Sequence, residues 1–213
     1  MGTIKKGILG GFSGKVGTVV GSSWKGIAYM RSIPQKVRNP RTLAQRSQRT
    51  KFALALSLLQ PMTGFLRIGW KLFAHRQSPI NAAMSYTIAN AISGEYPDYE
   101  IDPGKVLVSR GALTPVTDTF VSAAGDREVN LQWDDNSGKG TAKATDKALI
   151  AIVNLSKAAA ITDAEGALRP DSTKTITVPA EWTGDEAHVY MGFISEDGKE
   201  IANSVYLGAV TIT

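Results

Sequence analysis

The chain has 213 residues, of which 43 % are apolar and 20 % are charged, so it can bury the core of one large domain or two small ones. It has no cysteine, which excludes disulfides, thiol nucleophiles and thiolate metal sites. The formal net charge is only +5, but the charge is divided very unevenly along the chain.

The first 94 residues carry fourteen Lys and Arg residues and no Asp or Glu. All nineteen acids lie from Glu95 onward, together with the other ten bases, so the front part carries +14 and the rest −9. A cationic segment without acids of its own needs an external anion. This predicts nucleic acid, an anionic membrane or the acidic surface of another subunit as the partner.

Residues 1–38 are rich in glycine and in residues typical of strands. Two apolar stretches, Val16 to Trp24 and Ile27 to Ile33, flank Lys25 and Gly26, which predicts a basic β-hairpin with Gly26 in its turn. Glycines also interrupt every apolar run near the N-terminus. We therefore expect no signal peptide and no membrane span, and a cytoplasmic or virion-associated protein.

Residues 39–94 are expected to form three helices. Thr42 and Gln45 have the spacing of a capping box, so the first helix should begin near Thr42, and Pro61 should end it. The second is predicted over residues 65–75. The third should begin at Ser78 and end before Gly94. One of its faces is uncharged, which predicts a subunit interface at Asn81, Ser85, Tyr86 and Ala89.

After a linker at residues 95–103, short alternating segments predict a β-sandwich over residues 104–213. The predicted fold class is therefore α+β, with a basic hairpin and three-helix module at residues 1–94 and a seven-stranded sandwich of immunoglobulin or fibronectin type. The seven strand candidates are residues 106–108, 116–121, 129–133, 149–155, 173–178, 189–194 and 205–212.

The candidate anion-binding residues are basic side chains within a short part of the front half. Trp24 and Tyr29 lie between them and could stack on bases. Because no sequence-reading motif accompanies them, we expect binding that ignores base sequence and weakens with salt. The alternative interpretation is a solvated basic surface. The set comprises Lys15, Lys25, Arg31, Lys36, Arg38, Arg41, Arg46, Arg49 and Lys51.

No residue pattern predicts catalysis, a cofactor or a metal site. Gly14-Lys15 lacks the glycine and hydroxyl positions of a phosphate-binding loop. The two histidines lie in different predicted parts of the chain, His75 in the helical part and His188 in the sandwich. The alternating acids Asp98, Glu100 and Asp102 fit a charged strand face better than a calcium site. We expect no enzyme and no small-molecule substrate.

Three resemblances add to these predictions. Residues 129–133 and 186–193 resemble the early Trp strand and the late Tyr strand of fibronectin type III-like sandwiches, which act chiefly as spacers and binding platforms. Residues 5–17, 24–26, 31–34 and 39–42 together resemble an uncharacterised Bacteroidota family of similar length. Asn39-Pro40-Arg41-Thr42 with Gln45 and Arg49 resembles a motif of small phage and prophage proteins.

Three hypotheses follow. The first is a non-enzymatic structural protein whose cationic half binds nucleic acid or a neighbouring subunit, plausible in a phage-like assembly. The second is a head-to-tail homo-oligomer or filament without nucleic acid, because opposite charges on one chain attract. The third is a surface module in which the sandwich binds a protein or glycan and the basic part touches lipid.

Overall fold

The computed structural model describes residues 2–4, 7, 10–24, 26–34, 36 and 39–213. The chain separates into two compact units, residues 1–45 and residues 46–213. The second unit therefore begins within the first turn of the longest helix. Each unit is described by itself below.

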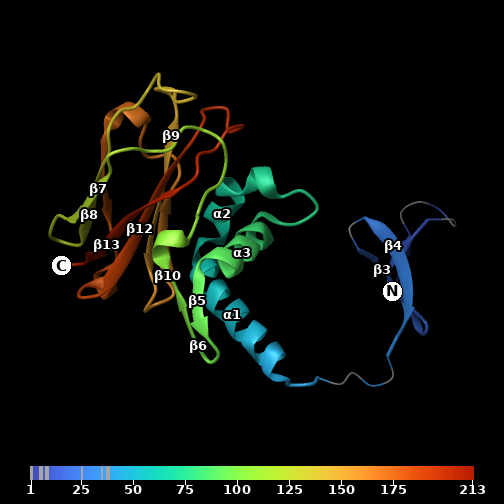
Figure 1. Ribbon diagram of the computed structural model, residues 1–213. Coiled ribbons are helices and arrows are strands. Elements are labelled where there is room, and N and C mark those ends of the chain that lie inside the picture. The colour runs from blue at the N-terminus through green and yellow to red at the C-terminus, as the bar shows by residue number, and fades with distance from the viewer. Residues whose placement is uncertain (1, 5–6, 8–9, 25, 35, 37–38) are drawn as a thin grey trace. The chain divides into compact units, whose positions relative to one another are not determined.

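The first unit is an antiparallel sheet of strands in the order β1-β2-β3-β4 (Figure 1). The predicted hairpin is confirmed as β3 and β4, and Gly26 in its turn has φ +85°. Phe12 packs its ring over Gly21, where a Cβ would overlap it. Gly21 is the one buried residue among those described in this unit. The strands are β1 (Thr3–Ile4), β2 (Phe12–Val16), β3 (Val19–Trp24) and β4 (Ile27–Ser32).

The helices of the second unit follow directly. Helix α1 covers Leu43–Leu59, and Thr42 Oγ1 accepts a hydrogen bond of 3.3 Å from the Gln45 N–H, as the predicted cap requires. A short 3₁₀ turn at Gln60–Met62 leads into α2, Thr63–Gly69, and another at Lys71–Phe73 follows it. Helix α3 covers Pro79–Asn90, with Ser78 Oγ capping its first turn.

A β-hairpin follows α3, where the sequence predicted the end of the helix and a linker. Strands β5 (Ile92–Glu95) and β6 (Asp98–Ile101) pair with each other. Gly94 therefore lies in β5, with φ +87°, and does not end the helix. A Cβ at this glycine would overlap the carbonyl oxygen of Asp98, so the hairpin needs glycine here.

The sandwich consists of two antiparallel sheets, in the orders β10-β9-β12-β13 and β11-β8-β7. Its strands are β7 (Phe120–Ala123), β8 (Glu128–Gln132), β9 (Lys147–Asn154), β10 (Ala159–Asp163), β11 (Thr173–Thr177), β12 (Glu186–Ile194) and β13 (Val205–Thr211). The mixed α+β class is thus confirmed.

Two strand predictions were wrong. Residues 106–108 form no strand, because the backbone N–H groups of Val108 and Ser109 donate to the side-chain Oγ of Ser204 instead of a neighbouring strand. Strand β10 was missed: residues 159–163 show weak alternation, and pairing with β9 makes them a strand. Strand β7 also begins at Phe120, later than the predicted segment.

The helices share a core with the sandwich. Leu58, Met62 and Leu66 belong to the same buried cluster as Leu149 and Ala151 of β9. The opposite face of β9 and β12 packs against the three-stranded sheet. The second unit therefore has three layers, helices, four-stranded sheet and three-stranded sheet (Figure 1). This shared core explains why the compact units divide near residue 45, and not at the expected linker of residues 95–103.

Candidate nucleic-acid interface

The ladder of the N-terminal sheet places basic and aromatic side chains on one face. Lys15 pairs with Val20, and Val20 pairs with Arg31. In the same register Ser22 pairs with Tyr29, and Trp24 pairs with Ile27. Directly paired residues project from the same side of a sheet, and residues two apart along a strand share that side. We call Lys15, Trp24, Tyr29 and Arg31 the basic-aromatic face.

This face is open to solvent within the described part of its unit. Trp24 is 63 % exposed and Tyr29 is 41 % exposed, and both Lys15 and Arg31 are exposed. Ile27, which pairs with Trp24, is 67 % exposed. It was not among the predicted site residues, because a single isoleucine has no functional signature in a sequence. Exposed aromatic rings between cations can stack on bases while the cations contact phosphates.

The opposite face of the same sheet is apolar. Ile4 pairs with Phe12, Val16 pairs with Val19, and Met30 pairs with Gly21. Of these, Ile4, Val16 and Met30 remain exposed, and Met30 is 70 % exposed. A sheet normally buries at least one face against another layer. Among its described residues this unit has no buried side-chain core.

The predicted basic residues on α1 belong to the other compact unit. The guanidinium of Arg46 lies 6.0 Å from the ring centroid of Tyr96, and Lys51 Nζ lies 4.7 Å from that of Tyr99. Both tyrosines come from the β5–β6 hairpin, which also carries Glu95, Asp98 and Glu100. Ser47 Oγ and the Tyr99 hydroxyl lie 2.6 Å apart. Arg46 and Lys51 thus lie against aromatic rings of their own unit.

The remaining candidates do not extend the basic-aromatic face. Lys36 and Arg41 are exposed between β4 and α1, and Arg49 is exposed on α1. Lys25 and Arg38 lie outside the described residues. The structure therefore assembles four of the predicted side chains on one sheet and does not unite the whole set.

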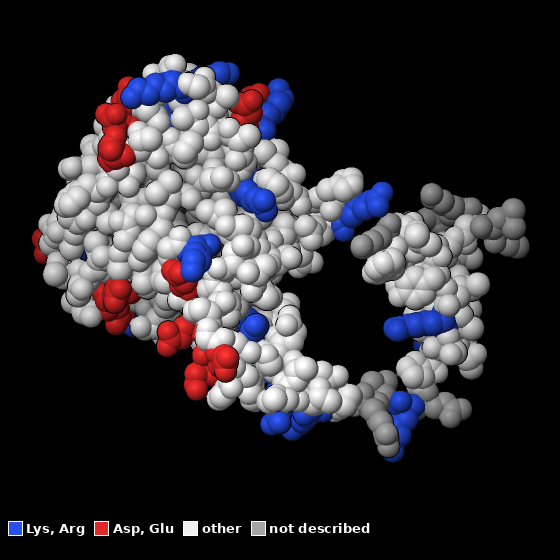
Figure 2. All heavy atoms as spheres, in the orientation of Figure 1, with Lys and Arg blue, Asp and Glu red and all other residues white. Residues whose placement is uncertain are grey.

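The ion pairs seen in the described part of the chain join cations and acids of the sandwich and of the segment that precedes its strands. They are Lys105–Asp102, Lys157–Asp185, Arg169–Asp146, Lys174–Asp163 and Lys199–Asp197. Acidic side chains are visible in Figure 2 only on the larger unit. Lys15 and Arg31 of the basic-aromatic face take part in none of these pairs.

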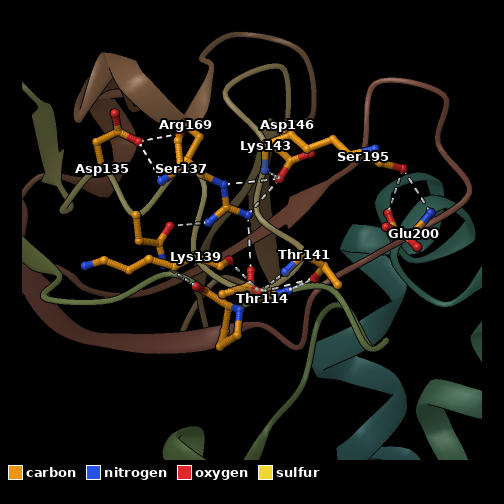
Figure 3. A network of polar contacts seen from close by, with 12 residues as sticks. Thr114, Asp135, Ser137, Lys139, Thr141, Lys143, Asp146, Arg169, Ser195 and Glu200 are labelled. Carbon is orange, nitrogen blue, oxygen red and sulfur yellow. Dashed lines mark hydrogen bonds and ion pairs between the residues drawn. The ribbon is translucent and has the colours of Figure 1, made fainter.

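The most extensive polar network lies inside the sandwich and was missed by the sequence analysis (Figure 3). Arg169 and Asp146 are fully buried and paired at 3.0 Å. The guanidinium also donates to Asn136 Oδ1 and to the Thr114 carbonyl, and it lies 3.8 Å from the Phe193 ring centroid. Burial lowers the pKa of Arg169, and the neighbouring carboxylate of Asp146 opposes this. The network joins the segments that contain Thr114, Asn136, Asp146 and Arg169.

The other candidate residues lie apart. His75 is exposed, whereas His188 is half-buried with its Nδ1 2.9 Å from the Tyr206 hydroxyl. Asp102 caps a turn and pairs with Lys105, so it does not act with Asp98 and Glu100. Within residues 39–213 and the described positions before them, no group of three His, Asp or Glu residues could hold a metal ion.

On α3, Asn81, Ser85 and Ala89 of the predicted interface are exposed. The fourth residue, Tyr86, is half-buried, with its ring centroid 5.6 Å from that of Trp70. The helix turns Ala82, Ala83, Met84 and Thr87 into the core.

One continuous helical stretch, Leu43–Gly69, is long and apolar enough for a membrane span by length and composition. The sequence predicted no membrane span. Its buried residues include Ala55, Leu58 and Leu59, which pack in the shared core of the second unit. Other apolar residues of the stretch stay exposed, Leu43 at 61 % and Phe52 at 50 %.

Comparisons with known proteins give one family and a set of structural neighbours. A family model described as a family of unknown function (DUF6266) matches residues 11–208. No curated protein matches the chain. The fn3 domain of human collagen alpha-1(XX) chain is similar over 49 % of this chain and 90 % of its own, with 7 % identity and a TM-score of 0.36. The fn3 domain of human contactin 1 covers 57 % of this chain and 93 % of its own, with 9 % identity and a TM-score of 0.35.

Proposed function

We propose that this chain, which belongs to the family of unknown function DUF6266, is a non-enzymatic assembly protein that binds single-stranded nucleic acid through its N-terminal sheet. The observation that carries the proposal is the ladder register, which collects Lys15, Trp24, Tyr29 and Arg31 on one exposed face. The phage-like setting is part of the proposal and rests on the short motif at residues 39–49.

Single strands suit this face better than duplexes. Stacking on Trp24 and Tyr29 requires bases that are not already stacked and paired within a helix. The cations contact phosphates, which are the same in every sequence. The expected binding is therefore independent of base sequence and strongly salt-dependent.

The test is fluorescence anisotropy with a labelled oligonucleotide of about 20 thymidines, compared with a duplex of equal length, at about 50 and about 200 mM salt. The single strand should bind more tightly than the duplex, and both should weaken with salt. Replacing both Lys15 and Arg31 by Gln should reduce the salt slope by about 1.4, since each phosphate contact contributes about 0.7 on a single strand.

Matched variants separate this face from net charge. Lys139→Gln with Lys143→Gln removes the same charge from exposed positions of the sandwich, and it should leave binding unchanged. Trp24→Ala with Tyr29→Ala should weaken binding of single strands and leave the salt slope intact, because stacking releases no counterions. An equal loss of binding from the Lys15 and Arg31 substitutions and from the Lys139 and Lys143 substitutions would contradict the proposal.

A second candidate function is self-assembly through the sheet, and the exposure of β4 favours it. All six residues of β4 are exposed, and β4 is an edge strand of the sheet as described. An exposed apolar edge can pair with the same strand of another copy. Sedimentation at low and high salt tests this: a chain that stays monomeric at high concentration in both would exclude it.

A further inference from the structure

The larger unit contains a second cationic feature, at Arg110, far along the chain from the basic N-terminal part. Arg110 lies in the segment that links the β5–β6 hairpin to the sandwich, and its backbone N–H donates to the carbonyl of Gly69 at 2.9 Å. Ser109 Oγ donates to the carbonyl of Ala202 at 2.9 Å, and the Ser109 carbonyl accepts from the Ser204 N–H. The backbone around Arg110 is thus held from both the helical and the sandwich side.

Three aromatic rings surround the Arg110 guanidinium. Its Cζ lies 4.5 Å from the ring centroid of Phe73, 5.3 Å from that of Tyr86 and 5.8 Å from that of Trp70. Trp70 is itself fixed, because it is 1 % exposed and its Nε1–H donates to the Leu107 carbonyl. Cation–π contacts hold the guanidinium in place through its face and leave its N–H edges available.

Those N–H edges have no protein acceptor among the residues that the structure describes. The contacts of the Arg110 side chain there are the three aromatic ones, and no carboxylate forms an ion pair with it. An arginine held by rings and not by an acid has unused capacity for a planar, bidentate anion.

The guanidinium borders a hollow of about 410 Å³, which is large enough for a short peptide end or a small ligand. Its wall includes Ser85, Tyr86 and Asn90 of α3, as well as Gln77. The Gln77 and Asn90 amides each donate one N–H to a backbone carbonyl, of Phe73 and Tyr86 respectively, and keep a second N–H. Together with the Ser85 hydroxyl they supply donors around one cation. No acid occurs in residues 63–94, from which most of the wall comes, so the local charge favours an anion.

We infer that this hollow binds a peptide carboxylate, with Arg110 as the bidentate donor and the rings of Phe73 and Tyr86 as the walls. A carboxylate matches the fork of one guanidinium and has only acceptors to offer to the surrounding donors. A phosphate group carries more charge, and the wall provides no second cation for it. The uncharged outer face of α3 then serves as the rim around the docked peptide.

The test is NMR titration of the full chain, following the Arg110 Nε–H and Trp70 Nε1–H signals. One probe is an acetylated tetrapeptide whose only carboxylate is at its C-terminus. The second is its amidated isomer with the carboxylate on a central glutamate. Saturable shifts with either peptide support the inference, and the tighter one identifies which carboxylate the hollow prefers. An amidated peptide without a carboxylate and inorganic phosphate are the controls.

Two variants remove binding in different ways. Arg110→Gln should weaken the preferred peptide about tenfold or more, since it removes a charge-assisted bidentate contact. Ala89→Phe should also abolish binding by filling the hollow from an exposed position, while the guanidinium stays in place. Arg67→Gln, on the exposed side of α2, should leave binding unchanged. Three results would overturn the inference. They are undiminished peptide binding by the Ala89→Phe variant, no shifts with either peptide, and phosphate binding as tight as that of the peptides.

Discussion

The guanidinium of Arg169 donates from Nε and Nη2 to one oxygen of Asp146, at 3.2 and 3.0 Å, and neither side chain reaches solvent. The pair comes from separate loops, Asp146 just before β9 and Arg169 just before β11. The Arg169 backbone carbonyl also accepts from the indole Nε1–H of Trp133 at 2.8 Å. Three segments of the sandwich therefore meet at one buried arginine.

Replacing Arg169 by Met should lower the free energy of unfolding by about 3–5 kcal/mol, because Asp146 would be left buried without its counterion. Urea denaturation monitored by tryptophan fluorescence measures this. Lys174→Met breaks the partly exposed pair with Asp163 and should cost no more than about 1 kcal/mol. If the two substitutions cost the same, the buried pair would not be the anchor of these loops.

Gly69 permits the close approach on which the Arg110 hollow depends. A Cβ at this position would overlap the Val108 carbonyl oxygen, which belongs to the backbone and cannot swing away. Gly69→Ala should therefore destabilise the chain by about 1–3 kcal/mol. Thermal unfolding provides the measurement.

The same helix α2 offers a matched control for this prediction. A Cβ at Gly64 would meet no atom within 4 Å, so Gly64→Ala should be neutral or stabilising, by up to about 1 kcal/mol. If the Gly69→Ala variant were as stable as the Gly64→Ala variant, the segment at residues 108–110 would not lie too close to α2 for a side chain at residue 69.

Stability should fall as the pH drops through the titration range of His188. Burial lowers the pKa of His188 from its ordinary value of 6.5, and Glu186 partly opposes this. The unfolded chain then binds a proton that the folded chain resists, so the free energy of unfolding decreases as the pH falls below about 6.5. Urea denaturation at about pH 7, 6 and 5 measures the slope.

His188→Asn should flatten this slope, since it removes the titrating group. The carboxylates whose pKa is lowered by hydrogen bonds lose their contribution only below about pH 4; they are Asp102, Asp135, Asp185 and Asp197. An unchanged slope in the His188→Asn variant would assign the pH dependence to other groups.

The amino-acid sequence alone determined the local features of this protein. Gly26 between two β-branched stretches predicted the β3–β4 hairpin, and the Thr42 and Gln45 spacing predicted where α1 begins. Turn and cap signals depend on residues close together in the chain, so they can be read without a fold. The charge division likewise follows from composition, and it led to the basic-aromatic face.

Only the tertiary structure decided which distant residues meet. The division near residue 45, the Arg169–Asp146 pair and the aromatic surroundings of Arg110 all join segments separated by tens of residues. The residues of β10 show little of the alternation typical of a strand, and they form one because they pair with β9. Packing and pairing between remote segments set these features, and no local pattern in the sequence records them.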